Sequence, residues 1–151
     1  MSQQGTIALR EATGADRAFL LDVRKQGLRE DVVRVWGSWD DDRQGCYIDR
    51  LLSAGEVRVV CCDGADVGML TVERREGSLH VENIVLLPPV QVAGVGTRLL
   101  SDVSRRADGL GLPSTLEVLR ASRARGLYER LGFVSNGETD THVRMRQPPA
   151  G

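Results

Sequence analysis

The chain has 151 residues, of which 41% are hydrophobic and 27% are charged, and its formal net charge is −1. These values are typical of one globular domain with its own hydrophobic core. The near-neutral charge gives no general electrostatic attraction for nucleic acid or an anionic membrane. Aromatic residues make up only 4% of the chain, which also disfavours a base-stacking surface.

The cysteines and histidines do not form a recognisable framework. The chain has three cysteines, Cys46, Cys61 and Cys62. An odd number that includes an adjacent pair is not typical of a disulfide framework. No cluster with His80 or His142 has zinc-ligand spacing, so we expect no metal. The N-terminus lacks a basic-then-apolar signal pattern, and no apolar run reaches about 18 residues, so we expect a cytoplasmic protein without a membrane span.

The first predicted elements are a strand over Thr6–Ala12 and two helices. Thr13 and Asp16 resemble a capping box at the start of the first helix. The segment 31–42 is open to two interpretations, because its apolar start could continue that helix but a Gly-Ser pair interrupts it. Asp40–Asp42 suit the first turn of a second helix, which would end near Gly55.

Three strands are predicted next, over Val57–Cys62, Val67–Arg75 and Leu79–Leu87. Short turns join them into a meander, and Pro88-Pro89 ends the third strand because proline cannot donate to a ladder. The remaining predicted elements are a helix from Gly94 and Gly96 to Gly109–Gly111, a strand over Ser114–Arg120, a short helix ending at Gly132, and two strands within 133–145 around the turn Ser135–Gly137.

The predicted order is therefore β-α-α-β-β-β-α-β-α-β-β. This order indicates an α/β fold of the α+β kind, with a mixed, mostly antiparallel sheet flanked by helices. We expect a single domain over 1–151, with a core of 5–146 and a tail of 147–151.

The stretch Gln91–Leu100 (QVAGVGTRLL) joins the third strand of the meander to a helix. The first N–H groups of a helix have no internal partner and attract anions, and glycine allows close approach to them. A plain strand-to-helix turn is the structural alternative. Gly96 is followed by no lysine, which excludes a Walker loop, and position 99 is leucine, which breaks a dinucleotide fingerprint.

Gln91-x-x-Gly94-x-Gly96 resembles the Q/R-x-x-G-x-G/A signature of the GCN5-related N-acetyltransferase (GNAT) family. LYERLGF, Leu127–Phe133, resembles a second motif of many members, and the order of elements agrees over residues 5–146. The resemblance implies a single GNAT-like domain that takes acetyl-CoA as cosubstrate. Many members form dimers, so a homodimer is left open.

By this resemblance, backbone amides of the loop hold the CoA pyrophosphate, and the strand end polarises the thioester carbonyl. The pantetheine arm would lie between that strand end and Leu116–Leu119. Arg98 would reach a phosphate or, alternatively, remain a solvated helix-surface arginine. The implied CoA-binding residues are Val85, Leu86, Leu87, Gln91, Val92, Ala93, Gly94, Val95, Gly96, Thr97, Arg98 and Tyr128.

Acetyl transfer to an amine needs a base for the amine and an acid for the departing thiolate. Tyr128 matches the position of the tyrosine that serves as general acid in many family members. The alternative is that Tyr128 is a half-buried aromatic residue that only packs under its helix. Glu82 is the candidate base, and the alternative is a structural pairing with a neighbouring arginine or amide. His80 is a second candidate, and the alternative is an exposed histidine or one whose hydrogen bonds are already satisfied. Ala121 departs from the family, which often has an asparagine there, and this departure leaves the binding of the CoA arm less defined.

The acceptor site in this family is built from the two N-terminal helices and the last strands. Trp36, Trp39 and Asp40, together with Glu82, would receive a cationic amine there. The alternative is that the tryptophans anchor the helices and the aspartates cap the second one. The predicted function is N-acetyl transfer by direct attack in a ternary complex, on a small-molecule or peptide amine. A non-catalytic acyl-CoA-binding module is the alternative.

Overall fold

A computed structural model of the chain describes residues 6–91, 94–120 and 122–150. Its helices are α1 (Arg17–Trp36), α2 (Asp41–Ala54), α3 (Val95–Leu110) and α4 (Ala124–Arg130), with the short 3-10 helices η1 (Gly14–Asp16) and η2 (Pro88–Val90). Its strands are β1 (Ile7–Glu11), β2 (Val57–Cys62), β3 (Ala65–Arg75), β4 (Ser78–Leu86), β5 (Ser114–Leu119), β6 (Val134–Glu138) and β7 (His142–Gln147).

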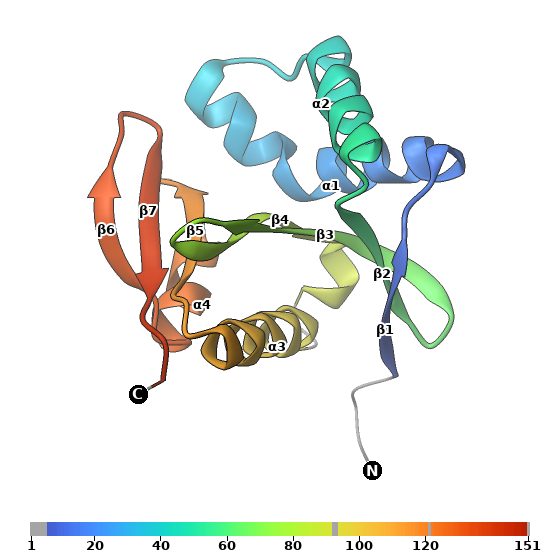
Figure 1. The fold of residues 1–151 in the computed structure, drawn as a ribbon. Helices are drawn as coiled ribbons and strands as arrows, with labels where there is room; N and C mark the ends of the chain where they lie inside the picture. Colours follow the sequence, from blue (N-terminus) through green and yellow to red (C-terminus); the bar gives the residue numbers. More distant parts are fainter. Residues whose placement is uncertain (1–5, 92–93, 121, 151) are drawn as a thin grey trace. The chain divides into compact units, whose positions relative to one another are not determined.

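Within the described residues, seven strands form one mixed sheet in the order β1-β2-β3-β4-β5-β7-β6 (Figure 1). β4 and β5 run parallel, whereas β1 with β2, β2 with β3, β5 with β7 and β6 with β7 are antiparallel. The predicted element order and fold class are confirmed. None of the helices in this described part is long and apolar enough to cross a membrane.

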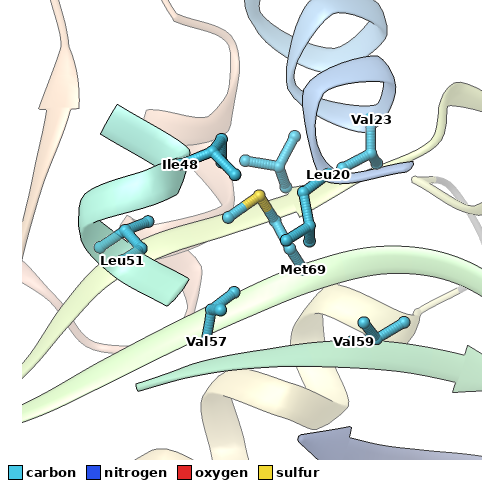
Figure 2. Close-up of a cluster of buried hydrophobic side chains, with 8 residues drawn as sticks. Leu20, Val23, Ile48, Leu51, Val57, Val59 and Met69 are labelled. Carbon is cyan, nitrogen blue, oxygen red and sulfur yellow. The ribbon is translucent and has the colours of Figure 1, made fainter. Parts of the chain in front are cut away.

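The chain divides into two compact units, Met1–Thr71 with Asn83–Gly96, and Val72–Glu82 with Thr97–Gly151. The first unit has its own core, in which side chains of α1, α2, β2 and β3 converge (Figure 2). These residues are buried because they recur at helical spacing on α1 and α2 and alternate on β2. They are Leu20, Val23, Ile48, Leu51, Val57, Val59 and Met69.

The helix ends of this unit follow their local chemistry. The capping box of Thr13 and Asp16 is present and begins η1, which leads directly into α1. α1 continues through the ambiguous segment to Trp36 and ends at Gly37, whose φ of 86° is left-handed. The apolar periodicity therefore extends the helix until a residue without a Cβ can terminate it. α2 begins after its N-cap, Asp40.

In the second unit, β4 pairs with β5 through Leu79–Val81, opposite Ser114–Leu116. The predicted last turn is wrong. Ser135–Gly137 lie inside β6, where Gly137 has a φ of 131° and the register with β7 shifts between Ser135 and Glu138. The glycine thus marks a bulge.

The chain instead reverses at residues 139–141. The Thr139 hydroxyl oxygen accepts the N–H groups of Thr141 and His142, at 3.3 and 2.9 Å. This is the turn chemistry of a threonine side chain, and it replaces the expected Asn-Gly turn. β7 also extends to Gln147, one residue into the expected tail, where the Gln147 amide donates to the Leu131 carbonyl at 2.7 Å.

Candidate active site

The glycine loop begins where β4 ends and finishes in the first turn of α3. Gly94 has a φ of 79°, a left-handed conformation that glycine adopts without strain. α3 starts at the next residue, Val95, and Gly96 lies within its first turn. The N–H groups of that turn have no partner within the helix, so they form a potential anion site.

Thr97 and Arg98, the last residues of the predicted CoA-binding loop, both lie on the exposed surface of α3. Thr97 is exposed at the start of α3. Arg98 is also exposed, and its Nε lies 4.0 Å from the Asp102 carboxylate one turn on, an arrangement typical of a solvated helix surface. Val92 and Ala93 lie outside the described residues.

The end of β4 is buried and tied to the loop. Val85 and Leu86 are buried, and the Gln91 side-chain amide donates to the Leu86 carbonyl at 2.9 Å. The Leu87 N–H donates to the Val67 carbonyl of β3, also at 2.9 Å. Gln91, the first residue of the glycine signature, therefore fastens the loop to the strand end.

The hydrogen bond at the end of β4 lies one residue beyond the position that the β3–β4 turn predicts. The two-residue turn Glu76–Gly77 would place Val67 opposite Leu86 in an antiparallel pair. The Leu87 N–H donates to the Val67 carbonyl instead. We infer from this offset that β4 has an extra residue near its end, which is the arrangement of a bulge.

Tyr128 lies on α4 and is only 8% exposed. Its ring meets Phe133 edge-on, with 6.2 Å between the ring centroids. Burial raises the pKa of Tyr128 to about 12, so the phenol keeps its proton at physiological pH. A buried, protonated phenol is a suitable hydrogen-bond donor.

Glu82 and His80 lie two residues apart on β4, so their side chains project from the same face of the strand. His80 Nε2 is 3.8 Å from the Glu82 carboxylate, and Arg75 approaches the same carboxylate to 3.7 Å. His80 Nδ1 lies 2.8 Å from the Thr115 hydroxyl oxygen. Burial, and then the charge of Arg75, lower the pKa of His80, so the imidazole is neutral at physiological pH. Both groups therefore have structural partners as well as catalytic potential.

The tryptophans occupy the connection between α1 and α2. Trp36 is the last residue of α1 and is 52% exposed. Trp39 donates its indole N–H to Asp41 at 3.1 Å, and Asp40 accepts the Arg43 N–H at 3.0 Å as the N-cap of α2. Asp40 therefore caps α2, and Trp36 is the more exposed of the two tryptophans.

A buried polar network in the first unit was missed by the sequence reasoning. Arg24 of α1 is only 8% exposed, and its Nη1 donates to Asn83 Oδ1 at 2.5 Å. Asn83 Nδ2 donates to the Tyr47 hydroxyl at 2.5 Å, and the Arg24 guanidinium lies 4.6 Å from the Tyr47 ring centroid. The network links α1, α2 and β4. Its sequence signal was an arginine four residues after Leu20, on the apolar face of α1.

The predicted site residues thus fall into groups within the two units. The first unit brings together Val85–Leu87 with Gln91, and Trp39 with Asp41. The second brings together Glu82 and His80 and also contains Tyr128. Among the residues that the structure describes, no group of three or more His, Cys, Asp or Glu side chains could hold a metal ion.

Comparisons with known structures show the same fold. PH1933 from Pyrococcus horikoshii superposes with a TM-score of 0.77 at 19% identity, covering 96% of this chain and 99% of that one. The PaiA N-acetyltransferase from Thermoplasma acidophilum, solved in complex with coenzyme A, has a TM-score of 0.72 at 15% identity, with coverage of 95% and 99%. The ribosomal-protein-S18-alanine N-acetyltransferase from Escherichia coli has a TM-score of 0.69 at 17% identity, with coverage of 97% and 96%.

Sequence comparison identifies the family. No curated protein matches the chain. A family model of the GNAT acetyltransferase domain, however, matches residues 53–135, which is more than half of the chain. That segment contains the end of β4, the glycine loop and the LYERLGF motif. The chain therefore belongs to the GNAT acetyltransferase family and is an acyltransferase of the GNAT type.

Proposed function

We propose that this protein transfers an acetyl group from acetyl-CoA to an amine, by direct attack of the amine in a ternary complex. The observation that carries the proposal is the connection from β4 to α3. Gly94, left-handed at φ 79°, stands directly before the unpaired amides of α3, and Gln91 fastens this loop to Leu86. The geometry suits a ligand with a phosphate group at one end and a carbonyl at the other.

The loop supplies the phosphate end of this site. The first-turn N–H groups of α3, from Val95 to Thr97, would donate to the CoA pyrophosphate, assisted by the helix dipole. Gly94 permits close approach because it has no side chain. Arg98 is better assigned to the helix surface, since its guanidinium already approaches Asp102.

The end of β4 supplies the carbonyl end. Acetyl-CoA would provide an activated acetyl group as a thioester. Backbone N–H groups of the strand end around Val85 and Leu86 would donate to its carbonyl oxygen and stabilise the charge that develops there. The pairing of β4 with β5 involves Leu79–Val81, upstream of this segment.

Tyr128 would assist the departing thiolate. A thiol has an ordinary pKa of about 8.5, below the pKa of about 12 that burial gives to Tyr128. Proton transfer from the phenol to a free thiolate is therefore uphill by roughly 3 to 4 pKa units. Tyr128 would consequently stabilise the sulfur chiefly by donating a hydrogen bond.

Glu82 would accept the proton that the amine must lose before attack. Its carboxylate is about a quarter exposed, so an amine or an intervening water could reach it. His80 is neutral and lies 3.8 Å away, so it can share this task or orient the carboxylate. The ion pair with Arg75 holds the carboxylate in place.

The acceptor would enter near the connection of α1 and α2. The exposed indole of Trp36 offers a cation–π surface to a protonated amine, and Asp41 provides a carboxylate beside Trp39. Asp40 contributes as the cap that fixes the start of α2.

A thiol-release assay over a panel of small-molecule and peptide amines tests the proposal. We expect turnover with at least one amine, and Tyr128→Phe should lower kcat about 100-fold while CoA affinity, measured by calorimetry, is retained. Tight acetyl-CoA binding without turnover of any amine would contradict it and favour a non-catalytic acyl-CoA-binding module. Loss of CoA binding altogether would contradict the loop assignment.

A further inference from the structure

Gly27 lies near the middle of α1, a 20-residue helix in which alanine would be more stable than glycine. A Cβ at this position would lie 2.6 Å from Val85 Cγ1 and 3.4 Å from the Leu86 carbonyl oxygen. Val85 is buried, and its branched side chain has few alternative rotamers. The glycine therefore permits a close approach of α1 to the end of β4.

Gly68 of β3 approaches the same two residues. A Cβ on Gly68 would lie 2.5 Å from the Val85 carbonyl oxygen and 2.6 Å from Leu86 Cδ2. Gly45 has a comparable conflict, but its Cβ would meet only the flexible end of the Arg17 side chain. Two separate elements thus lack a Cβ where they contact Val85 and Leu86.

A third contact fixes this segment from the loop. The Leu86 carbonyl oxygen accepts the Gln91 side-chain amide at 2.9 Å, and Gly27 lies close to both groups. The backbone of Val85 and Leu86 is therefore held by α1, by β3 and by the glycine loop. This is the segment whose backbone N–H groups, in the proposed function, would meet the thioester carbonyl.

We propose that Gly27 and Gly68 are positioning residues for acetyl transfer. By omitting a Cβ, they hold the Val85–Leu86 backbone at the place where its N–H groups meet the thioester carbonyl. The inference rests on the proposed function and adds α1 to the elements that determine the rate. A displacement of about 1 Å in a reacting geometry can cost about 100-fold in rate.

Gly27→Ala is the test, because it favours the helix while forcing Val85 to move. We expect the melting temperature to fall by only a few degrees, because a helix gain of about 1 kcal/mol offsets part of the packing conflict of about 1–3 kcal/mol. CoA affinity should change less than about threefold, and kcat should fall about 10- to 100-fold. In wild-type protein, the ¹³C signal of the carbonyl carbon in bound [1-¹³C]acetyl-CoA should lie downfield of the free signal, because donated hydrogen bonds polarise the carbonyl. In Gly27→Ala it should return toward the free value.

Two further variants separate positioning from simple disruption. Gly27→Ala combined with Val85→Ala removes the conflicting Cγ1, so the effect of Gly27→Ala on kcat and on the NMR shift should largely disappear when the double variant is compared with Val85→Ala alone. Gly109→Ala is the matched control, since Gly109 is a helical glycine of α3 where an added Cβ would meet nothing within 4 Å. This control should leave both readouts at wild-type values.

The outcomes are distinct. Wild-type kcat and a wild-type carbonyl shift in Gly27→Ala would overturn the inference, even with acetyl transfer established. A Gly27→Ala defect that persists in the double variant would also overturn it, because the Val85 contact would not be its cause. Bound acetyl-CoA without any carbonyl shift in the wild type would instead contradict the proposed polarisation, and the inference with it.

Discussion

Replacing Asn83 with leucine tests the buried network that joins α1, α2 and β4. Leucine has a similar size but provides neither an acceptor for Arg24 nor a donor for Tyr47. The substitution therefore removes two hydrogen bonds while leaving the volume of the site nearly unchanged. It also leaves a buried guanidinium with one acceptor fewer, which is the costly part of the change.

The magnitude follows from these two bonds. A hydrogen bond from a charged donor such as the Arg24 guanidinium contributes about 1.5–3 kcal/mol, and a neutral one, such as that to the Tyr47 hydroxyl, about 1 kcal/mol. We expect Asn83→Leu to lower the free energy of unfolding by about 3 kcal/mol in total. For a domain of this size that corresponds to a fall in melting temperature of roughly 6–12 °C.

Urea unfolding at pH 7, followed by circular dichroism, measures this difference from the midpoint and slope. Asn83→Asp is the matched variant, because its carboxylate still accepts from Arg24. The adjacent guanidinium should lower the pKa of that carboxyl, so its stabilisation is present above the ordinary pKa of about 3.9 and disappears as the pH falls below it. At pH 7 this variant should be close to wild type.

Two results would refute the reasoning about Asn83. One is a free energy of unfolding for Asn83→Leu within about 0.5 kcal/mol of wild type, the range of ordinary surface substitutions. The other is an Asn83→Asp variant as unstable as Asn83→Leu at pH 7, since the acceptor for Arg24 would then be irrelevant. Either result would mean that packing alone joins these elements.

Three further predictions concern the site itself. Gly94→Ala places a Cβ on a residue with a φ of 79°, which costs about 1–2 kcal/mol of strain. This strain should weaken CoA binding, measured by calorimetry, about tenfold or more. An unchanged affinity would mean that the loop does not bind the phosphate groups. Glu82→Gln should lower the rate mainly at low pH, where the amine is protonated, and a pH–rate profile identical to wild type would exclude Glu82 as the base. The pKa of His80 is lowered in the fold, so protonation of His80 opposes folding, and the free energy of unfolding of the wild type should decline as the pH falls below about 6.5. In urea unfolding, His80→Gln should not show this decline. A decline equal to that of the wild type would mean that other groups cause it.

Local chemistry was sufficient for most of the fold. The capping box of Thr13, the N-cap Asp40 and the terminal glycine of α2 act between residues close in sequence, so their pattern predicted these helix ends. The end of α1 at Gly37 was left open, because the segment 31–42 allowed two interpretations. The last hairpin was misread because Asn136-Gly137 is suited to both a tight turn and a bulge. The choice between them depends on the pairing of β6 with β7, which the local sequence does not contain.

Features that depend on neighbouring residues could be predicted from the sequence, whereas contacts between distant side chains could not. The glycines before α3 and the two-residue spacing of His80 and Glu82 each lie within one segment. The contact of Arg24 with Asn83 joins residues 59 positions apart, and only the packing of α1 on the sheet brings them together. Gly27 was missed for the same reason, since its role is defined by the residue that approaches it.

The bond from Gln91 to the Leu86 carbonyl also explains which residues the first position of the family signature tolerates. That position requires a side chain long enough to reach back to the strand and equipped with an N–H group, because the partner is an acceptor. Glutamine and arginine, the two residues of the signature, share both properties. Glutamate matches glutamine in length but can only accept when ionised, so it would repel the carbonyl and release the loop from the strand.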